Sequence, residues 1–225
     1  MYEVIAQYYD LFMDDGEWIK FAEDAVKGKG RGADVGCGSG AVSIALAAEH
    51  DIVAIDASTD MLRIASDKFM RMGLRIPTIL QKAEALKLSF KAEFITAMCD
   101  VVNYLPSPTK FFKAAYNNLK EDGVLVFDIS SEHKLKNVLG NNVYTETRND
   151  ITYIWENTLR GNRVEMTLTF FIPETHGMYK KAVDVQTQYI HTDKDIENAL
   201  ISCGFNVKKT DRGDRIYFVA QKAGG

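Results

Sequence analysis

The sequence lacks a long apolar run, a strongly basic cluster and a set of paired cysteines, and each absence excludes a class of protein. No stretch approaches the 18 apolar residues of a membrane-spanning helix, and residues 1–20 are acidic, unlike a signal peptide. The formal net charge is −4 and no Lys/Arg cluster is present, which argues against a stable nucleic-acid partner. The three cysteines are far apart and odd in number, a pattern typical of a reducing compartment. We therefore expect a soluble, cytoplasmic protein without a membrane partner.

The sequence also has few candidates for metal ligands. Its four histidines are His50, His133, His176 and His191. None of them has the spacing to another histidine, cysteine or carboxylate that is typical of a metal site. No bound metal is predicted.

The 225 residues are enough for one α/β domain with its own core. Short apolar strands alternate with helices of about ten residues between positions 33 and 129. This alternation predicts a doubly wound, mostly parallel sheet. The expected strands are 33–36, 51–56, 76–80, 93–99 and 123–129, and the expected helices between them are 41–48, 60–72 and 108–119.

The segments that flank this core have a different pattern. Two helices, 2–13 and 16–27, are expected before the first strand. Residues 143–190 alternate apolar and polar side chains, which predicts an inserted antiparallel sheet. A helix at 193–202 and two strands at 205–210 and 215–220 should follow, and their hairpin makes the last strand antiparallel.

A glycine-rich loop, Asp34-Val-Gly-Cys-Gly-Ser-Gly40, lies between the first strand and the next helix. Such a loop brings backbone N–H groups close to a polar ligand, because no Cβ blocks the approach. Gly36-x-Gly38-x-x-Ala41 also satisfies the dinucleotide fingerprint, with Asp56 placed to bind a ribose. On this pattern alone, an NAD-dependent oxidoreductase remains an alternative.

Three features favour a different nucleoside. Asp34 stands two residues before the first glycine, where a carboxylate suits an ammonium group and would repel a pyrophosphate. The third glycine is Gly40 rather than residue 41, and the chain ends in a hairpin after a parallel sheet.

The loop resembles the first motif of class I S-adenosylmethionine-dependent methyltransferases of the small-molecule type. Residues 54–58 resemble the strand end whose acid binds the ribose, and residues 81–85 resemble the adenine motif. Residues 96–105 resemble the fourth-strand motif, which runs beneath the cofactor towards the acceptor. Tyr8-Tyr9-Asp10 resembles the family's lid helix.

The resemblance implies a three-layer, Rossmann-like fold with a seven-stranded, mostly parallel sheet. Residues 1–225 would form a single methyltransferase domain. Residues 1–30 would be lid helices, and residues 141–191 would be an antiparallel β insertion that covers the acceptor site.

The resemblance also implies the residues of the site. Asp56 would bind both ribose hydroxyls, Glu84 would meet the adenine amino group, and the backbone N–H of Ala85 would meet the ring. The cofactor-binding candidates are Tyr9, Asp34, Gly36, Cys37, Gly38, Gly40, Asp56, Ala57, Met61, Glu84, Ala85, Met98 and Cys99. The catalytic candidates are Asp100 and Tyr104 at the end of the fourth strand and His133 after the fifth.

The implied reaction is an in-line displacement that moves the methyl group of S-adenosylmethionine to a small molecule and leaves S-adenosylhomocysteine. Residues 99–102 replace the Asn/Asp-Pro-Pro-Tyr and Pro-Cys motifs of base- and glutamine-modifying enzymes. A small amine, hydroxyl or carboxylate therefore remains as acceptor. A non-catalytic cofactor-binding protein is a further alternative, and either a monomer or a homodimer is compatible with the sequence.

Overall fold

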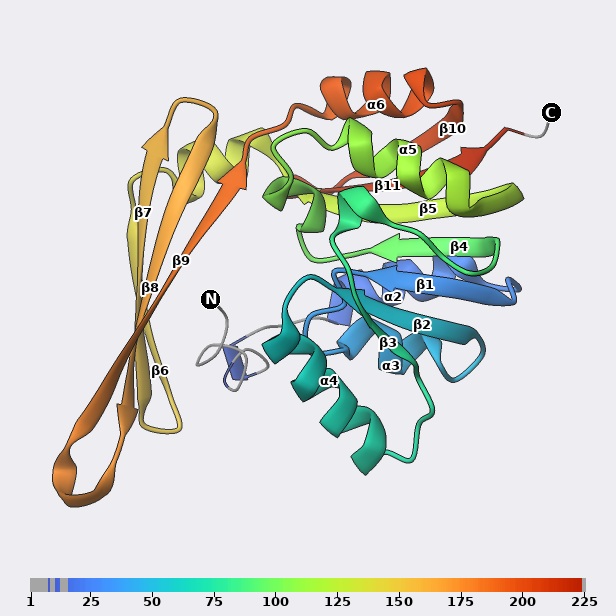
Figure 1. The fold of residues 1–225 in the computed structure, drawn as a ribbon. Coiled ribbons are helices and arrows are strands. Elements are labelled where there is room, and N and C mark those ends of the chain that lie inside the picture. The colour runs from blue at the N-terminus through green and yellow to red at the C-terminus, as the bar shows by residue number, and fades with distance from the viewer. Residues whose placement is uncertain (1–7, 9–10, 13–15, 224–225) are drawn as a thin grey trace.

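A seven-stranded sheet forms the centre of the molecule (Figure 1). The computed structural model describes residues 8, 11–12 and 16–223. The strand order is β10-β11-β5-β4-β1-β2-β3, in which β11 pairs antiparallel with β5 and β10, and the other pairs are parallel. The strands are β1 (Arg31–Val35), β2 (Asp51–Asp56), β3 (Thr78–Leu80), β4 (Ala92–Ala97), β5 (Leu119–Ser130), β10 (Phe205–Asp211) and β11 (Arg215–Lys222). This is the predicted doubly wound fold with an antiparallel last strand.

Helices cover both faces of this sheet, so its central strands are apolar on both sides. Alternate residues of β5 show this, since Val124 and Val126 belong to one buried cluster and Leu125 and Phe127 to another. One face carries α2 (Gly16–Val26), α3 (Ala41–Leu46) and α4 (Thr59–Arg71). The other carries α5 (Thr109–Asn118) and α6 (Asp193–Ser202).

Local sequence explains where the helices begin. Ser58 caps α4, because its side chain accepts a hydrogen bond from the Met61 backbone N–H at 3.3 Å. Thr192 caps α6 in the same way through the Asp195 N–H. The predicted bounds of β2 and α6 are correct. The predicted helix 108–119 is one residue too long at each end, because Pro108 is the N-cap residue and Leu119 already pairs with Ala92 in the sheet.

A second, four-stranded antiparallel sheet is formed by the predicted insertion. Its strands are β6 (Val143–Arg148), β7 (Ile151–Arg160), β8 (Arg163–Pro173) and β9 (Tyr179–Tyr189). A short π-helix, η3 (Lys134–Leu139), links β5 to it and packs Leu135 and Leu139 against Val164 and Met166. Figure 1 shows this sheet standing beyond the end towards which the β4 arrow points.

The insertion also contacts the N-terminal segment. Tyr8, Leu11 and Phe12 pack against Ile151 and Phe170 on the inner face of the insertion. Tyr9 and much of the predicted first lid helix lie outside the described residues. No helix among residues 8, 11–12 and 16–223 is long and apolar enough to cross a membrane.

Candidate functional site

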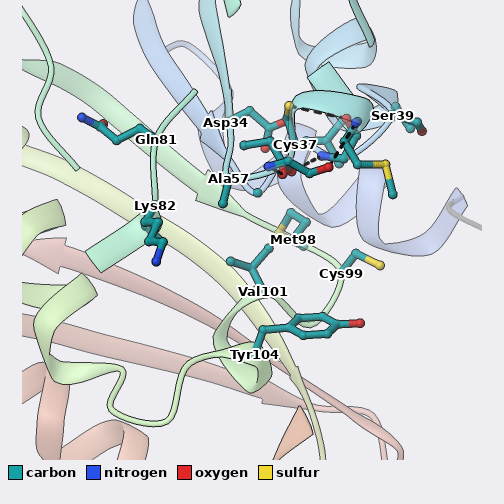
Figure 2. A pocket seen from close by; sticks show the side chains of 18 of the residues that line it. Asp34, Cys37, Ser39, Ala57, Gln81, Lys82, Met98, Cys99, Val101 and Tyr104 are labelled. Atoms are coloured by element: carbon teal, nitrogen blue, oxygen red, sulfur yellow. Dashed lines mark hydrogen bonds between the residues drawn. The ribbon is translucent and has the colours of Figure 1, made fainter. Parts of the chain in front are cut away.

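A cavity of about 750 Å³ lies at the carboxyl ends of β1, β2 and β4, within the size range of small-molecule sites. This is the point where the strand order changes direction, since β1 pairs with β2 on one side and β4 on the other. Two short 3-10 helices, η1 (Ala83–Ala85) and η2 (Val101–Tyr104), complete the walls. Figure 2 shows Asp34 and Cys37 at the top of the view, Met98 and Cys99 below them, and Tyr104 at the bottom.

Most of the predicted cofactor residues meet in this cavity. Its lining includes Asp34, Gly36, Cys37, Gly38, Asp56, Ala57, Met61, Glu84, Met98 and Cys99, and also the catalytic candidate Tyr104. Gly40 and Ala85 are not among the described residues that line it, and Tyr9 lies outside the described residues. The cofactor roles of these residues stay predictions.

Asp56 connects the glycine-rich loop to the end of β2. One carboxylate oxygen accepts the Gly38 N–H at 2.9 Å, and the other accepts the Ser58 N–H at 2.8 Å. Burial raises the pKa of this carboxyl, and these backbone donors act in the opposite direction. Since Ser58 rather than Asp56 caps α4, the remaining acceptor positions of Asp56 are available to a ligand in the cavity.

Asp34 is almost completely buried beneath the loop, with 1% of its surface exposed. Its oxygens accept hydrogen bonds from Ser43 Oγ at 2.6 Å and Thr96 Oγ1 at 2.8 Å. Burial raises the pKa of Asp34 to about 6, although the two hydroxyls lower it. The donors to this buried carboxylate, the Ser43 and Thr96 hydroxyls and the Ser43 backbone N–H, are all uncharged. A buried charge without an opposite charge is unfavourable, and a ligand cation would stabilise it.

The loop glycines fall into two groups by what surrounds them. A Cβ at Gly38 would meet no protein atom within 4 Å, because the residue faces the cavity. A Cβ at Gly40 would lie 2.6 Å from the Phe69 ring. Gly40 therefore allows α4 to pack closely against the loop, whereas Gly38 leaves room for a ligand.

This difference gives a testable prediction. Gly38→Ala should cost only about 1–2 kcal/mol of backbone strain, since φ is +55°, but should weaken S-adenosylhomocysteine binding at least about tenfold. Gly40→Ala, at φ +89°, should lower the free energy of unfolding by about 2–4 kcal/mol through strain and overpacking. Urea unfolding and calorimetric titration would measure both effects. Unchanged affinity in a folded Gly38→Ala variant would contradict the placement of the ligand.

The other two catalytic candidates lie outside the cavity lining. His133 is exposed, and its ring Nδ1 accepts a hydrogen bond from Asn137 Nδ2 at 3.0 Å. Asp100 forms an ion pair with Arg215, with 3.0 Å between Oδ1 and Nη1. Their expected position beside the acceptor came from their place after β4 and β5, but neither is among the described lining residues.

Sequence reasoning did not assign a site role to Trp18, which lines the cavity from α2. Its side chain is buried, and its Nε1 atom has no hydrogen-bond partner among the described residues. A ligand acceptor could therefore satisfy this donor. The only sequence signal was its place on the apolar stripe of α2, which is equally typical of a core residue.

Tyr104 connects the cavity to the antiparallel sheet. Its hydroxyl donates to Gln186 Oε1 of β9 at 2.8 Å, and Gln186 Nε2 donates to Asp184 Oδ2 at 2.8 Å. Asn103 Nδ2 donates to the Tyr189 carbonyl at 3.0 Å. The insertion is therefore attached to the helical turn that forms one wall of the cavity.

Comparison with known proteins gives concordant results. A family model described as "Methyltransferase domain" matches residues 33–123. A protein of Geobacillus sp. (strain WCH70), named as a methyltransferase, is 30% identical over 98% of this chain and 99% of its own length.

Solved structures of methyltransferases match this chain over nearly its whole length. An S-adenosylmethionine-dependent methyltransferase from Clostridium acetobutylicum is 29% identical, with a TM-score of 0.90 over 99% of both chains. CalS10 of Micromonospora echinaspora, an amino pentose methyltransferase solved with S-adenosylmethionine bound, is 18% identical. Its TM-score is 0.78 over 97% of this chain and 95% of its own, which shows a shared fold.

Proposed function

Because the chain belongs to the class I S-adenosylmethionine-dependent methyltransferases, we propose that it methylates a small-molecule amine. The observation that carries this proposal is the cavity in which the glycine-rich loop, Asp34 and Asp56 meet. The dinucleotide alternative fits this cavity poorly, since the buried Asp34 would repel a pyrophosphate.

The residues present fit the cofactor at three points. Asp56 keeps free acceptor positions for two ribose hydroxyls, a bidentate arrangement with a charged acceptor. The open space beside Gly38 permits close approach of the ligand to the loop backbone. Asp34 supplies a buried negative charge for the amino-acid end, where the cofactor carries an ammonium group.

The chemistry requires little more than positioning. S-adenosylmethionine supplies a methyl group already activated by its sulfonium sulfur. The chain holds the two reactants in line and excludes water, which can account for about 7–11 kcal/mol of the barrier. A neutral amine carries its own lone pair and needs no strong base. No histidine is found among the described residues that line the cavity, which favours an amine over a hydroxyl acceptor.

In this proposal, the antiparallel sheet forms part of the binding site for the methyl acceptor. Asp184 is buried on β9, two hydrogen bonds from the cavity residue Tyr104. Burial raises the pKa of Asp184, while the bond from Gln186 lowers it. A negative charge in this position would attract a protonated amine, which must release its proton to solvent before the neutral amine attacks the methyl group. In this proposal, residues 141–191 cover the acceptor site and Tyr104 contacts the acceptor.

A screen with isotopically labelled S-adenosylmethionine tests the proposal. We expect methyl transfer to members of a panel of small primary and secondary amines, amino sugars included, and loss of that transfer in Asp56→Ala. Panels of alcohols and carboxylic acids serve as comparison. Methylation confined to those two panels would contradict an amine acceptor, and absence of transfer to any panel would favour a non-catalytic cofactor-binding protein.

A further inference from the structure

A buried ion-pair cluster lies directly behind the cavity wall. Arg215, the first residue of β11, contacts the Asp128 carboxylate of β5. The same guanidinium lies 3.0 Å and 3.4 Å from the two oxygens of Asp100. The Asp128 side chain is fully buried, and those of Asp100 and Arg215 are 13% and 18% exposed. Three charged groups therefore meet where water has little access.

Asp128 holds the backbone that follows β4. Its oxygens accept the N–H of Cys99 at 2.6 Å and the N–H of Asp100 at 3.3 Å. Both residues have φ of +64°, a left-handed conformation that residues other than glycine rarely adopt. Successive N–H groups arranged in this way form a concave anion site. The Asp128 carboxylate occupies that site and stabilises the unusual turn.

Asp100 accepts hydrogen bonds from two residues of the cluster and its surroundings. Its Oδ1 atom accepts from Ser130 Oγ at 2.9 Å as well as from Arg215. Burial opposes its charge, but the Arg215 and Lys134 charges and the hydrogen bonds from Ser130 and Arg215 together outweigh this effect and lower the pKa of Asp100. A carboxylate that is paired and retains its charge is a poor proton acceptor, so its role is in holding the turn.

The cluster reaches the cavity at two places. Cys99, whose N–H binds Asp128, lines the cavity. Trp18 also lines it, and the Arg215 guanidinium carbon lies 5.0 Å from the centre of its ring. Arg215 thus supports two parts of the wall without lining the cavity itself.

We propose that Arg215 and Asp128 are positioning residues for methyl transfer, which set the places of Cys99 and Trp18 against the bound reactants. This inference rests on the proposed function. It assigns to Asp100 a part in the same support rather than the role of a base. An error of about 1 Å in the alignment of reactants can cost about 100-fold in rate, so the effect should fall on kcat.

The main test is Arg215→Lys, which keeps the charge but loses the planar fork that contacts both carboxylates. With an amine that the wild-type enzyme methylates, we expect kcat to fall about 10- to 100-fold. The dissociation constant of S-adenosylhomocysteine should change less than about threefold and the unfolding midpoint should stay close to that of the wild type. Arg212→Lys is the matched control, since Arg212 lies in the turn between β10 and β11, three residues before Arg215. It pairs with the exposed Glu17 and does not line the cavity.

A double variant, Arg215→Gln with Asp128→Asn, removes one buried charge of each sign, so the net charge of the cluster is unchanged and Asp100 keeps its hydrogen bond from Ser130 Oγ. It should show the same selective loss of kcat. Activity of Arg215→Lys equal to that of Arg212→Lys would overturn the inference. So would a loss in which kcat, S-adenosylhomocysteine affinity and folded fraction fall in parallel. Failure of the wild-type enzyme to methylate any acceptor would instead overturn the proposed function, and this inference with it.

Discussion

Asp56→Ala should weaken the binding of S-adenosylhomocysteine by about 100-fold or more. If Asp56 binds the ribose as proposed, the substitution removes two hydrogen bonds from ribose hydroxyls to a charged acceptor, each worth about 1.5–3 kcal/mol. It also releases the Gly38 N–H, which Asp56 holds at 2.9 Å, so the loop keeps its backbone bond from the Cys37 N–H to the Ile55 carbonyl of β2 but loses this second attachment. Isothermal titration calorimetry at fixed pH and salt concentration would measure the change.

Asp51→Ala is the matched control for this experiment. Asp51 opens the same strand at its other end, and its side chain is 64% exposed beside Arg31. Its loss should leave the affinity unchanged within about twofold, since an exposed ion pair contributes little. Equal affinity of the Asp56→Ala and wild-type proteins would exclude Asp56 as a ribose ligand.

Asp34→Asn should make the ligand-free protein more stable and the cofactor complex weaker. The pKa of Asp34 rises from 3.8 to about 6 on burial, so the folded state holds a proton more tightly than the unfolded state. The stability that this group contributes is therefore complete below pH 4 and is lost as the pH rises through 6. The difference between the two pKa values corresponds to about 3 kcal/mol in the free energy of unfolding. Asparagine avoids this loss of stability because it carries no charge.

Urea unfolding between about pH 4 and pH 8 would test this prediction. The gain from Asp34→Asn should be largest near pH 8 and should shrink as the pH falls below 6, whereas Asp51→Asn should give no such trend. Binding of S-adenosylhomocysteine should weaken at least about tenfold, because the ligand's ammonium group loses a buried counter-charge. A variant that is less stable at every pH, or that binds normally, would contradict this role for Asp34.

These two aspartates also show what the sequence can predict. Both stand at carboxyl ends of parallel strands, and such ends meet at one edge of a doubly wound sheet. Asp34, Asp56 and Met98 accordingly line one cavity, although Met98 lies more than forty residues beyond Asp56. The apolar strand pattern and the glycine-rich loop, together with the family resemblance of residues 96–105, predicted that meeting.

The ion-pair cluster could not be predicted in this way. Arg215 reaches Asp100 and Asp128 only because β11 inserts antiparallel between β10 and β5 and brings its first residue beside the end of β5. Nothing local to Arg215 indicates either partner. The position of Asp100 after β4 suggested a catalytic group, but the side-chain contacts depend on a strand 115 residues away.

The loop that follows β5 shows a second limit. His133 follows a strand that ends near the cavity, which made it a candidate base. The chain turns there into the π-helix η3, which buries Leu135 and Leu139 and leaves His133 exposed. Which side of such a turn faces the cavity is decided by packing against the insertion, and that packing is not encoded in the local pattern.

The most direct test of the central claim is a crystal structure of the protein with S-adenosylhomocysteine. We expect the ribose hydroxyls within about 3.2 Å of the Asp56 carboxylate. The amino-acid end should lie against the glycine-rich loop above Asp34, and the sulfur should point towards Met98, Cys99 and Tyr104. Ligand bound elsewhere, or bound in this cavity with its ribose away from Asp56, would contradict the account.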